Sequence, residues 1–431
     1  MKRYETYKDS GIQWWEEIPT HWDLKKAKHI FSLVTENVSD SSLPKIALEN
    51  IESWTGKYIE TDSDFMGEGV EFKKDDILFG KLRPYLAKVY KAEFAGQAVG
   101  DMYVFRGNEE QNPEYLKYLL LSYPFISVVD GSTYGAKMPR ANWDFISHLV
   151  LPCPPKTEQV TIAAFLDHMV GKIDATIAEK EQMLEDLKNY RSAIISEAVT
   201  KGLDKNVEMK NSGIEWMGEI PSHWDIVKTS YLFDDIGSGT TPNTNDDSLY
   251  DADNGINWLQ TGDLNDGHIT KTSKKISQKA IEGNSTLRLY PVNSLVIALY
   301  GATIGKVGVL DIETTTNQAC CVLPPSDKVL TDYAYYVFIA SKKALLNLAS
   351  GGGQPNISQA IIKNHRIPYP SYVEQQAITT YLDNKVEQID KTLLELESQI
   401  HELKSYKSAL ITEAVTGKID LREWKPPKEN V

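Results

Sequence analysis

Two long stretches of the chain carry apolar residues at steps of three and four positions. The positions between them are filled mainly by polar and charged residues, with many glutamates and lysines. This spacing is typical of an amphipathic α-helix with one apolar stripe, close to the seam of a coiled coil. The apolar series are Ile162, Leu166, Met169, Ile173, Ile177, Leu184, Leu187, Ile194 and Ala198 in the first stretch, and Ile378, Leu382, Val386, Ile389, Leu393, Leu396, Ile400, Leu403, Leu410 and Ala414 in the second.

Each stretch has the start and stop signals of a helix. Prolines precede the two stretches at 152–155 and 368–370, and Gly202 and Gly417 follow them. A run of about 45 residues corresponds to roughly 65–70 Å of unbroken helix. Because one long amphipathic helix is unstable by itself, we expect the two helices to pair with each other in antiparallel orientation.

The segments before the two helices show shorter patterns. Apolar runs at 294–300 and 306–310 predict strands, and 113–121 and 333–340 predict short helices. We therefore expect an α+β fold in which two α/β domains are separated and joined by two long antiparallel coiled-coil helices. The expected boundaries are 1–150 and 205–366 for the domains, 151–204 and 367–420 for the helical spacers, and 421–431 for a C-terminal tail.

The order of these blocks repeats because the sequence itself repeats. Residues 10–23 (SGIQWWEEIPTHWD) return at 212–225 as SGIEWMGEIPSHWD, an offset of 202 residues. Residues 187–200 return at 403–416, an offset of 216, so the second variable block is 14 residues longer than the first. A shared frame with a divergent interior indicates one scaffold, with an internal pseudo-two-fold repeat, that holds two different recognition surfaces.

Composition and cysteine usage place the chain among soluble globular proteins. Apolar residues make up 41% and charged residues 25%, and no run of 18 apolar residues is present. The N-terminal residues lack the apolar stretch of a signal peptide, so we expect a cytoplasmic location. The three cysteines, Cys153, Cys320 and Cys321, fit neither a disulfide framework nor a zinc site.

The positions of the charged residues along the chain are more informative than the net charge. A net charge of −14 argues by itself against a nucleic-acid ligand. However, the windows 77–92, 131–143 and 333–373 contain lysines and arginines and no acid, while aspartates gather between 234 and 266. These windows lie at related places in the two repeats, which favours DNA contact there.

The motifs that resemble catalytic ones are incomplete. The segment 301–306 resembles a phosphate-binding loop, but it has three residues between its glycines instead of four, and Val307 follows the lysine. The segment 233–239 resembles the glycine loop of a methyltransferase, without the Asn/Asp-Pro-Pro-aromatic segment that would hold the target amino group. His21 and His223 have no evident orienting partner, so we expect them to pack or cap. The adjacent Trp22 and Trp224 are expected to anchor each domain against its helix.

Four loops are the best candidates for DNA contact. They are 79–88 with its counterpart 300–306, and 135–142 with its counterpart 351–358. Glycine lets the backbone approach a ligand, lysine contacts phosphate, arginine pairs with guanine, and glutamine or asparagine pairs with adenine. The alternative is that each is an ordinary polar loop. The candidate residues are Lys81, Arg83, Tyr85, Lys88, Lys137, Arg140, Asn142, Tyr300, Thr303, Lys306, Gln354, Asn356 and Ser358.

The chain resembles the specificity subunits of type I restriction-modification systems. The resemblance rests on the repeated opening Ser-Gly-Ile-x-Trp…Glu-Ile-Pro-x-His-Trp, on 301–308 (GATIGKVG), on 353–358 (GQPNIS), on 367–370 with Glu374 and Gln375, and on the Glu-Ala-Val-Thr helix ends. The first half departs from the family pattern at 81–85 and 137–142, which weakens the transfer of residue roles there.

The resemblance implies a non-catalytic subunit that binds double-stranded DNA. Each variable block would be a target-recognition domain for one half of a split, asymmetric site. The helices would space the two halves and dock two methyltransferase subunits, and two restriction-translocase subunits would complete the enzyme. The resemblance implies no cofactor on this chain, because AdoMet, ATP and Mg²⁺ belong to those partners. The alternatives are a coiled-coil interaction scaffold with two α/β heads, and a self-sufficient DNA enzyme.

Overall fold

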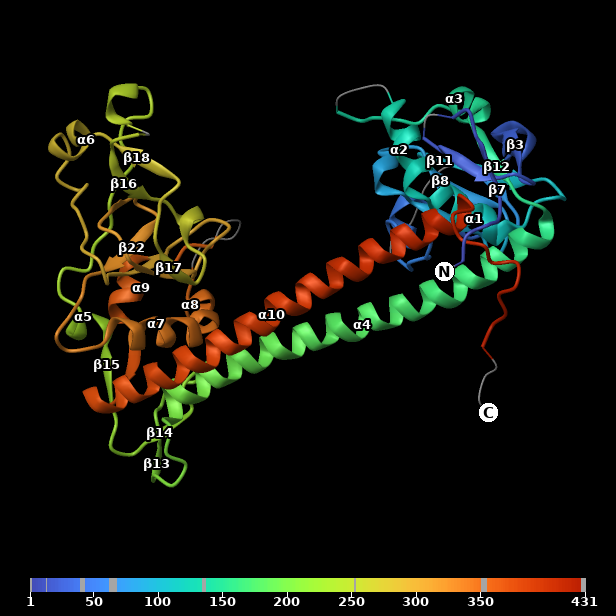
Figure 1. Ribbon diagram of the computed structural model, residues 1–431. Coiled ribbons are helices and arrows are strands. Elements are labelled where there is room, and N and C mark those ends of the chain that lie inside the picture. Colours follow the sequence, from blue (N-terminus) through green and yellow to red (C-terminus); the bar gives the residue numbers. More distant parts are fainter. Residues whose placement is uncertain are drawn as a thin grey trace. The chain divides into compact units, whose positions relative to one another are not determined.

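A computed structural model describes residues 2–12, 14–38, 43–61, 68–133, 137–251, 253–349 and 355–427. The chain divides into two compact units (Figure 1). Unit 1 comprises Met1–Gln182 and Glu397–Val431, and unit 2 comprises Met183–Leu396. Each unit therefore contains one variable block together with parts of both long helices. The finer division into five segments stays a prediction.

The described residues of unit 1 form two four-stranded sheets and two strand pairs. The sheets have the orders β4-β11-β8-β9 and β5-β7-β10-β6, and the pairs are β1-β2 and β3-β12. The strands are β1 Tyr7–Asp9, β2 Glu17–Pro19, β3 Asp23–Lys26, β4 Phe31–Val34, β5 Asn37–Val38, β6 Lys45–Ile46, β7 Gly69–Phe72, β8 Ile77–Gly80, β9 Val89–Lys91, β10 Gly96–Ala98, β11 Met102–Gly107 and β12 Val150–Cys153. The helices are α1 Pro113–Leu121, α2 Tyr123–Gly131, α3 Trp143–His148 and the 3₁₀ turns η1 Ala27–His29, η2 Leu48–Asn50 and η3 Pro84–Leu86.

Unit 2 follows a similar plan with different sheets: one sheet has three strands, and the four-stranded sheet has a parallel pair at its edge, whereas all pairs in β4-β11-β8-β9 are antiparallel. Its sheets have the orders β17-β20-β19-β22 and β18-β16-β21, and its strand pairs are β13-β14 and β15-β23. The strands are β13 Met209–Asn211, β14 Glu219–Pro221, β15 Asp225–Lys228, β16 Ile256–Leu259, β17 Gly267–Ile269, β18 Lys274–Ile276, β19 Leu295–Ala298, β20 Val307–Leu310, β21 Thr315–Thr316, β22 Cys320–Leu323 and β23 Arg366–Tyr369. The helices are α5 Thr229–Leu232, α6 Gln278–Glu282, α7 Thr331–Ala340, α8 Lys342–Asn347, α9 Gln359–Asn364 and the 3₁₀ turns η4 Asp247–Leu249 and η5 Thr261–Asp263.

The elements expected from the apolar runs are present. The runs at 294–300 and 306–310 form β19 and β20, and the two short helices are α1 and α7. The two long stretches form α4 Lys156–Lys201 and α10 Tyr372–Val415, each followed within two residues by a glycine with positive φ. In unit 1, α1 packs on β9 and β8, and in unit 2, α7 packs on β20 and β19. No described helix is long and apolar enough to cross a membrane.

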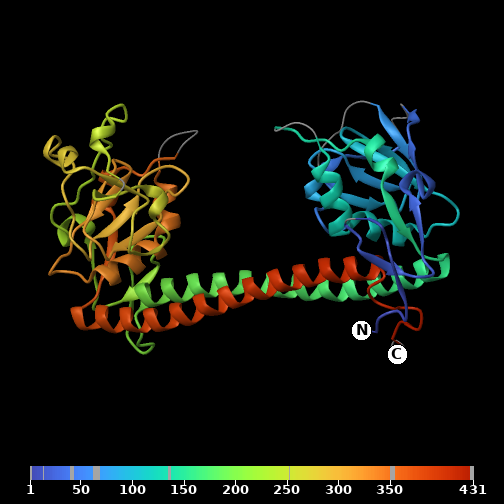
Figure 2. The same cartoon turned by 45° about the horizontal axis from the view of Figure 1, so that its top comes forward.

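The long helices pair in antiparallel orientation, as expected (Figures 1 and 2). In unit 1, Lys407 of α10 donates to Asp174 of α4 at 2.8 Å. In unit 2, Arg191 of α4 donates to both carboxylate oxygens of Asp390 of α10, at 2.6 and 3.0 Å. The 216-residue offset converts the first pair of residues into the second. The ion pair between the helices in unit 2 is therefore made by the repeat counterparts of the residues that pair in unit 1.

The core of unit 2 shows how a variable block joins the helices. Tyr333 of α7, Leu295 of β19, Val199 of α4 and Leu382 of α10 belong to one cluster of buried apolar residues. Burial of such side chains contributes about 1.5–3 kcal/mol each. The sheet, its covering helix and the ends of both long helices therefore form one hydrophobic core.

Candidate nucleic-acid interface

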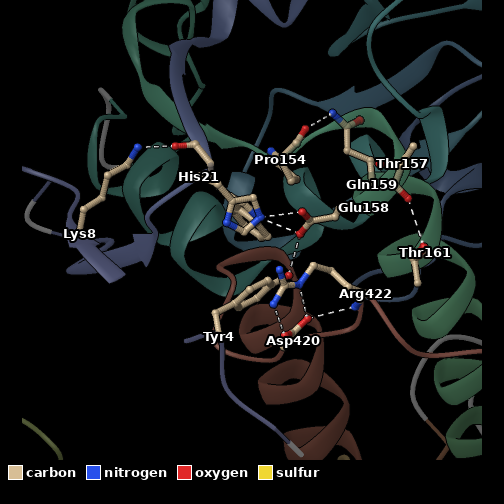
Figure 3. A network of polar contacts seen from close by, with 11 residues as sticks. Tyr4, Lys8, His21, Pro154, Thr157, Glu158, Gln159, Thr161, Asp420 and Arg422 are labelled. Carbon is tan, nitrogen blue, oxygen red and sulfur yellow. Dashed lines mark hydrogen bonds and ion pairs between the residues drawn. The ribbon is translucent and has the colours of Figure 1, made fainter. Parts of the chain in front are cut away.

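A carboxylate in the first turn of each long helix holds the entrance of each variable block. Glu158 of α4 accepts hydrogen bonds from His21 Nε2 at 2.6 Å, Trp22 Nε1 at 3.0 Å and the Tyr4 hydroxyl at 2.9 Å. Figure 3 shows Tyr4 and His21 converging on this carboxylate. Trp22 is fully buried. The structure thus confirms that the tryptophan anchors its domain. It corrects the expectation for the histidine, because Glu158 is an orienting partner that His21 contacts through a hydrogen bond.

Unit 2 builds the same anchor from the second repeat. Glu374 of α10 accepts hydrogen bonds from His223 Nε2 at 2.8 Å and Trp224 Nε1 at 3.0 Å. The next residue along the helix also has one role in both units. The side-chain amides of Gln159 and Gln375 each accept from one backbone N–H of the variable block and donate to a proline carbonyl. Repeated residues therefore make a repeated frame.

The anchor in unit 2 makes stability depend on pH. Burial raises the pKa of Glu374, but hydrogen bonds from Trp224, His223 and Ser371 outweigh it and lower the pKa from 4.5 to about 2. A carboxyl group with a lowered folded-state pKa stabilises the fold fully above its unfolded pKa, and this contribution is lost as the pH falls toward 2. We expect Glu374→Gln to flatten the fall in unfolding free energy between pH 4.5 and pH 2.

Denaturant unfolding of both proteins across that pH range measures the difference. The exposed Glu387→Gln on the same helix is the matched control, and its pH profile should follow the wild type. A Glu374→Gln protein with the wild-type profile would contradict this role for the carboxylate.

The candidate DNA-contact loops of each unit lie side by side. In unit 1, Lys81 O accepts from Ala141 N at 2.8 Å, and Leu82 bridges to Arg140. In unit 2, Leu299 O accepts from Ile357 N at 2.8 Å, and Tyr300 bridges to Asn356. The structure therefore brings two segments that are far apart in the sequence together at the end of β8 and at the end of β19.

These bridges show which residues of the two loops are equivalent. They align Leu82 with Tyr300 and therefore Arg83 with Gly301. Arg83 and Gly301 both have positive φ, at 52° and 89°. The shared feature is a left-handed turn after the strand, which glycine adopts easily and arginine adopts at some cost.

Three candidates in unit 1 are exposed at this turn, and two others share an acidic partner. Arg83, Tyr85 and Lys137 are exposed. Within the described part of the chain, no side-chain partner is seen for Arg83 or Lys137. By contrast, Arg140 forms a two-point ion pair with Asp101 at 3.1 and 3.0 Å, and Lys81 lies 3.8 Å from the same carboxylate. Asp101 therefore neutralises part of the positive charge that the acid-free windows suggested.

Several candidates also have structural roles. Lys88 donates to the Leu48 carbonyl at 2.6 Å. Asn142 and Ser358 cap the first turns of α3 and α9. Asn356 is exposed, and Tyr300, Thr303 and Lys306 are partly exposed. Gln354 lies outside the described residues. The assignment of these residues to DNA contact stays a prediction.

An aromatic group beside the turn of unit 1 was not among the residues predicted from the sequence. The rings of Trp54 and Tyr123 stack, with centroids 6.4 Å apart and planes 24° apart. Trp54 Nε1 donates to the Tyr85 carbonyl at 3.1 Å, so this group is continuous with the exposed Tyr85. Exposed aromatic rings next to cations suit contact with nucleotide bases. Among the described residues, no cluster of three or more His, Cys, Asp or Glu side chains is arranged to hold a metal ion.

Comparison with known proteins places the chain near one family. The model of the type I restriction modification DNA specificity domain matches residues 29–186 and 221–402. The specificity subunit of the type I restriction enzyme EcoBI from Escherichia coli is 22% identical over 380 residues, covering 83% of this chain and 76% of that protein. The MjaVIII specificity subunit from Methanocaldococcus jannaschii is 23% identical over 359 residues, covering 80% and 77%.

Solved structures share the fold. A chain from a study of complex assembly and conformational transition of the type I R-M system superposes with a TM-score of 0.75 at 19% identity, covering 93% of this chain and 99% of that chain. The HsdS subunit from Thermoanaerobacter tengcongensis gives a TM-score of 0.52 at 19% identity, covering 93% and 98%.

Proposed function

Because the chain belongs to the family of type I restriction-modification DNA specificity domains, we propose that it reads one asymmetric DNA site in two separate parts. The family model matches the chain twice, once mainly in each unit. One observation carries the proposal. The same frame presents a left-handed turn and its paired loop in both units, but the exposed side chains there differ. Different side chains on equivalent turns suit two different half-sites.

The exposed side chains supply the contacts with DNA bases and phosphates. In unit 1, Arg83 can bridge guanine O6 and N7, while Lys137 is suited to phosphate. In unit 2, Asn356 can pair with adenine, and Lys306 is suited to phosphate. Lys81 and Arg140 share the carboxylate of Asp101, which positions the turn, and their contact with DNA stays a prediction.

The chain acts in this proposal as a non-catalytic subunit in the cytoplasm. Two methyltransferase subunits dock on α4 and α10 and supply AdoMet chemistry, and two restriction-translocase subunits supply ATP- and Mg²⁺-dependent chemistry. A chain with a net charge of −14 attracts DNA poorly, so the partners contribute much of the attraction for phosphate.

Substitution at the exposed turn tests the proposal. In the complex with its methyltransferase subunits, we expect Arg83→Ala with Lys137→Ala to weaken binding to the target by about 10- to 100-fold. Asn356→Ala should act on the other half-site. Fluorescence anisotropy uses three duplexes, namely the intact target and the target with either half-site scrambled. For each variant, scrambling its own half-site should cost little further affinity.

Lys74→Ala is the matched control for the first variant. Lys74 is exposed and precedes β8, so it lies at the opposite end of the strand that Arg83 follows. Its binding should equal that of the wild type. If scrambling either half-site changed the affinity of the variant with Arg83→Ala and Lys137→Ala by the same factor, the assignment of one half-site to each unit would be wrong.

A further inference from the structure

The C-terminal tail of the chain covers one face of α4 in unit 1. The ring of Trp424 lies edge-on to Phe165, with centroids 5.5 Å apart and planes at 83°. It also lies 6.0 Å from the ring of His168, one turn further along the helix. Phe165 is 3% exposed in this arrangement.

The rest of the tail is fixed in the same place. Asp420 N donates to the Lys2 carbonyl at 2.9 Å, and the Asp420 carboxylate forms a two-point pair with Arg422. The Arg422 guanidinium lies 5.1 Å from the centre of the Tyr4 ring, and Figure 3 shows Asp420 and Arg422 beside Tyr4. Leu421 is buried. The tail is therefore a packed segment of unit 1.

The counterpart of this face in unit 2 is open. The 216-residue offset makes Tyr381 the counterpart of Phe165, and Asn384 the counterpart of His168. Tyr381 is 37% exposed. Tyr381 and Asn384 line a groove of about 550 Å³ along α10. Tyr381 also borders a second hollow of about 660 Å³, whose lining includes the end of α4 and Leu203.

Connectivity explains the difference between the two faces. Asp204 and Asp420 are counterparts, and each carboxylate accepts a hydrogen bond from the backbone N–H two residues later. The chain therefore leaves α4 and α10 through the same kind of turn. After Asp204 the chain enters β13 of unit 2. After Asp420 it continues as the tail and reaches Trp424. Among the described residues of unit 2, no tryptophan ring packs on Tyr381 as Trp424 packs on Phe165.

We propose that the tail makes the two helix faces unequal docking surfaces for the methyltransferase subunit. This inference rests on the proposed function, in which these helices dock that partner. The open face of α10 receives the first partner, which presents an aromatic side chain to Tyr381 as Trp424 does to Phe165. The face of α4 receives the second partner only when Trp424 leaves. Assembly is therefore ordered, and the chain's own tail sets the order.

The partner is favoured over a second copy of this chain as the occupant of the groove. In every copy Trp424 is already packed on its own α4, so filling the groove of another copy would uncover Phe165 and gain no net contact. A partner with a free aromatic side chain gains the contact without that loss.

Titration of the full-length chain with purified methyltransferase subunit, followed by native mass spectrometry, tests the order. For the wild type we expect two binding steps, the first at least about tenfold tighter than the second. Trp424→Ala should tighten the second step by about tenfold and leave the first unchanged. Tyr381→Ala should weaken the first step alone. Lys425→Ala, which changes an exposed neighbour of Trp424, should match the wild type.

Each alternative outcome has a distinct meaning. Two equal steps for the wild type, or a Trp424→Ala protein with wild-type affinities, would overturn the inference while docking on the helices stands. Failure of any partner to bind would overturn the proposed docking and the inference with it. Sedimentation of the chain alone should show a monomer, and a dimer that depends on Trp424 and Tyr381 would assign the groove to a second copy. Circular dichroism confirms that each variant is folded.

Discussion

Replacing Trp22 with alanine will destabilise unit 1 by about 3–5 kcal/mol, the usual loss for a large aromatic residue in a core. Trp22 is fully buried, donates to Glu158 and packs on the glycine that follows α10, where an added Cβ would lie 3.1 Å from its ring. The change therefore removes packing and leaves the buried acceptor Glu158 with one donor fewer. Hydrogen exchange of α1 in denaturant reports the stability of unit 1.

Trp224→Ala is the matched variant in unit 2. It removes the equivalent ring, which donates to Glu374 and packs against Gly202. Exchange of α7 should accelerate in this protein, while α1 keeps its wild-type rate. The reverse should hold for Trp22→Ala. If either substitution loosened α1 and α7 equally, the two units would not be independent folding units anchored by their own tryptophans.

Lengthening both long helices by seven residues will change the gap between the half-sites and leave their sequences intact. Seven residues keep the apolar stripe nearly in phase, with a drift of about 20°. They add about 10 Å to each helix, which equals at most about three base pairs. The insertions belong at the unit boundaries, after Gln182 in α4 and after Leu396 in α10. Sequencing of methylated DNA from cells with the complete complex measures the gap.

An insertion of seven residues in α4 alone is the control for this experiment. It moves Arg191 about two turns away from Asp390 while the Asp174–Lys407 pair stays in register, so the helices no longer match. We expect this protein to lose methylation altogether. If the double insertion altered the half-site sequences themselves, the helices would belong to the reading surface and not to the spacer.

The frame of this protein is predictable from its sequence because its signals are long or repeated. The three- and four-residue spacing persists over about 45 residues, so the pattern of α4 and α10 fits a helix and no other secondary structure. The repeated Trp22 and Trp224 indicated the anchors. The carboxylates that hold them, Glu158 and Glu374, lie more than 130 residues away from them in the sequence, and only the fold reveals those contacts.

The candidate interface was harder to predict for two physical reasons. Acid-free windows describe neighbours along the chain, but Asp101 lies between two such windows in sequence and reaches Lys81 and Arg140 in space. The left-handed turn after the strand is occupied by Arg83 in one unit and by Gly301 in the other, so no shared residue type marks it in the sequence. Strands as short as β5 and β6 carry no periodic signal at all.

The methylated sequence in a host that carries this chain with its methyltransferase subunits shows whether each unit reads its own half-site. We expect two unrelated short motifs separated by a constant number of unspecified base pairs. Exchanging residues 205–366 for the matching block of a relative should change one motif and preserve the other. A single contiguous methylated motif, or a change in both motifs after that exchange, would contradict the reading of one half-site by each unit.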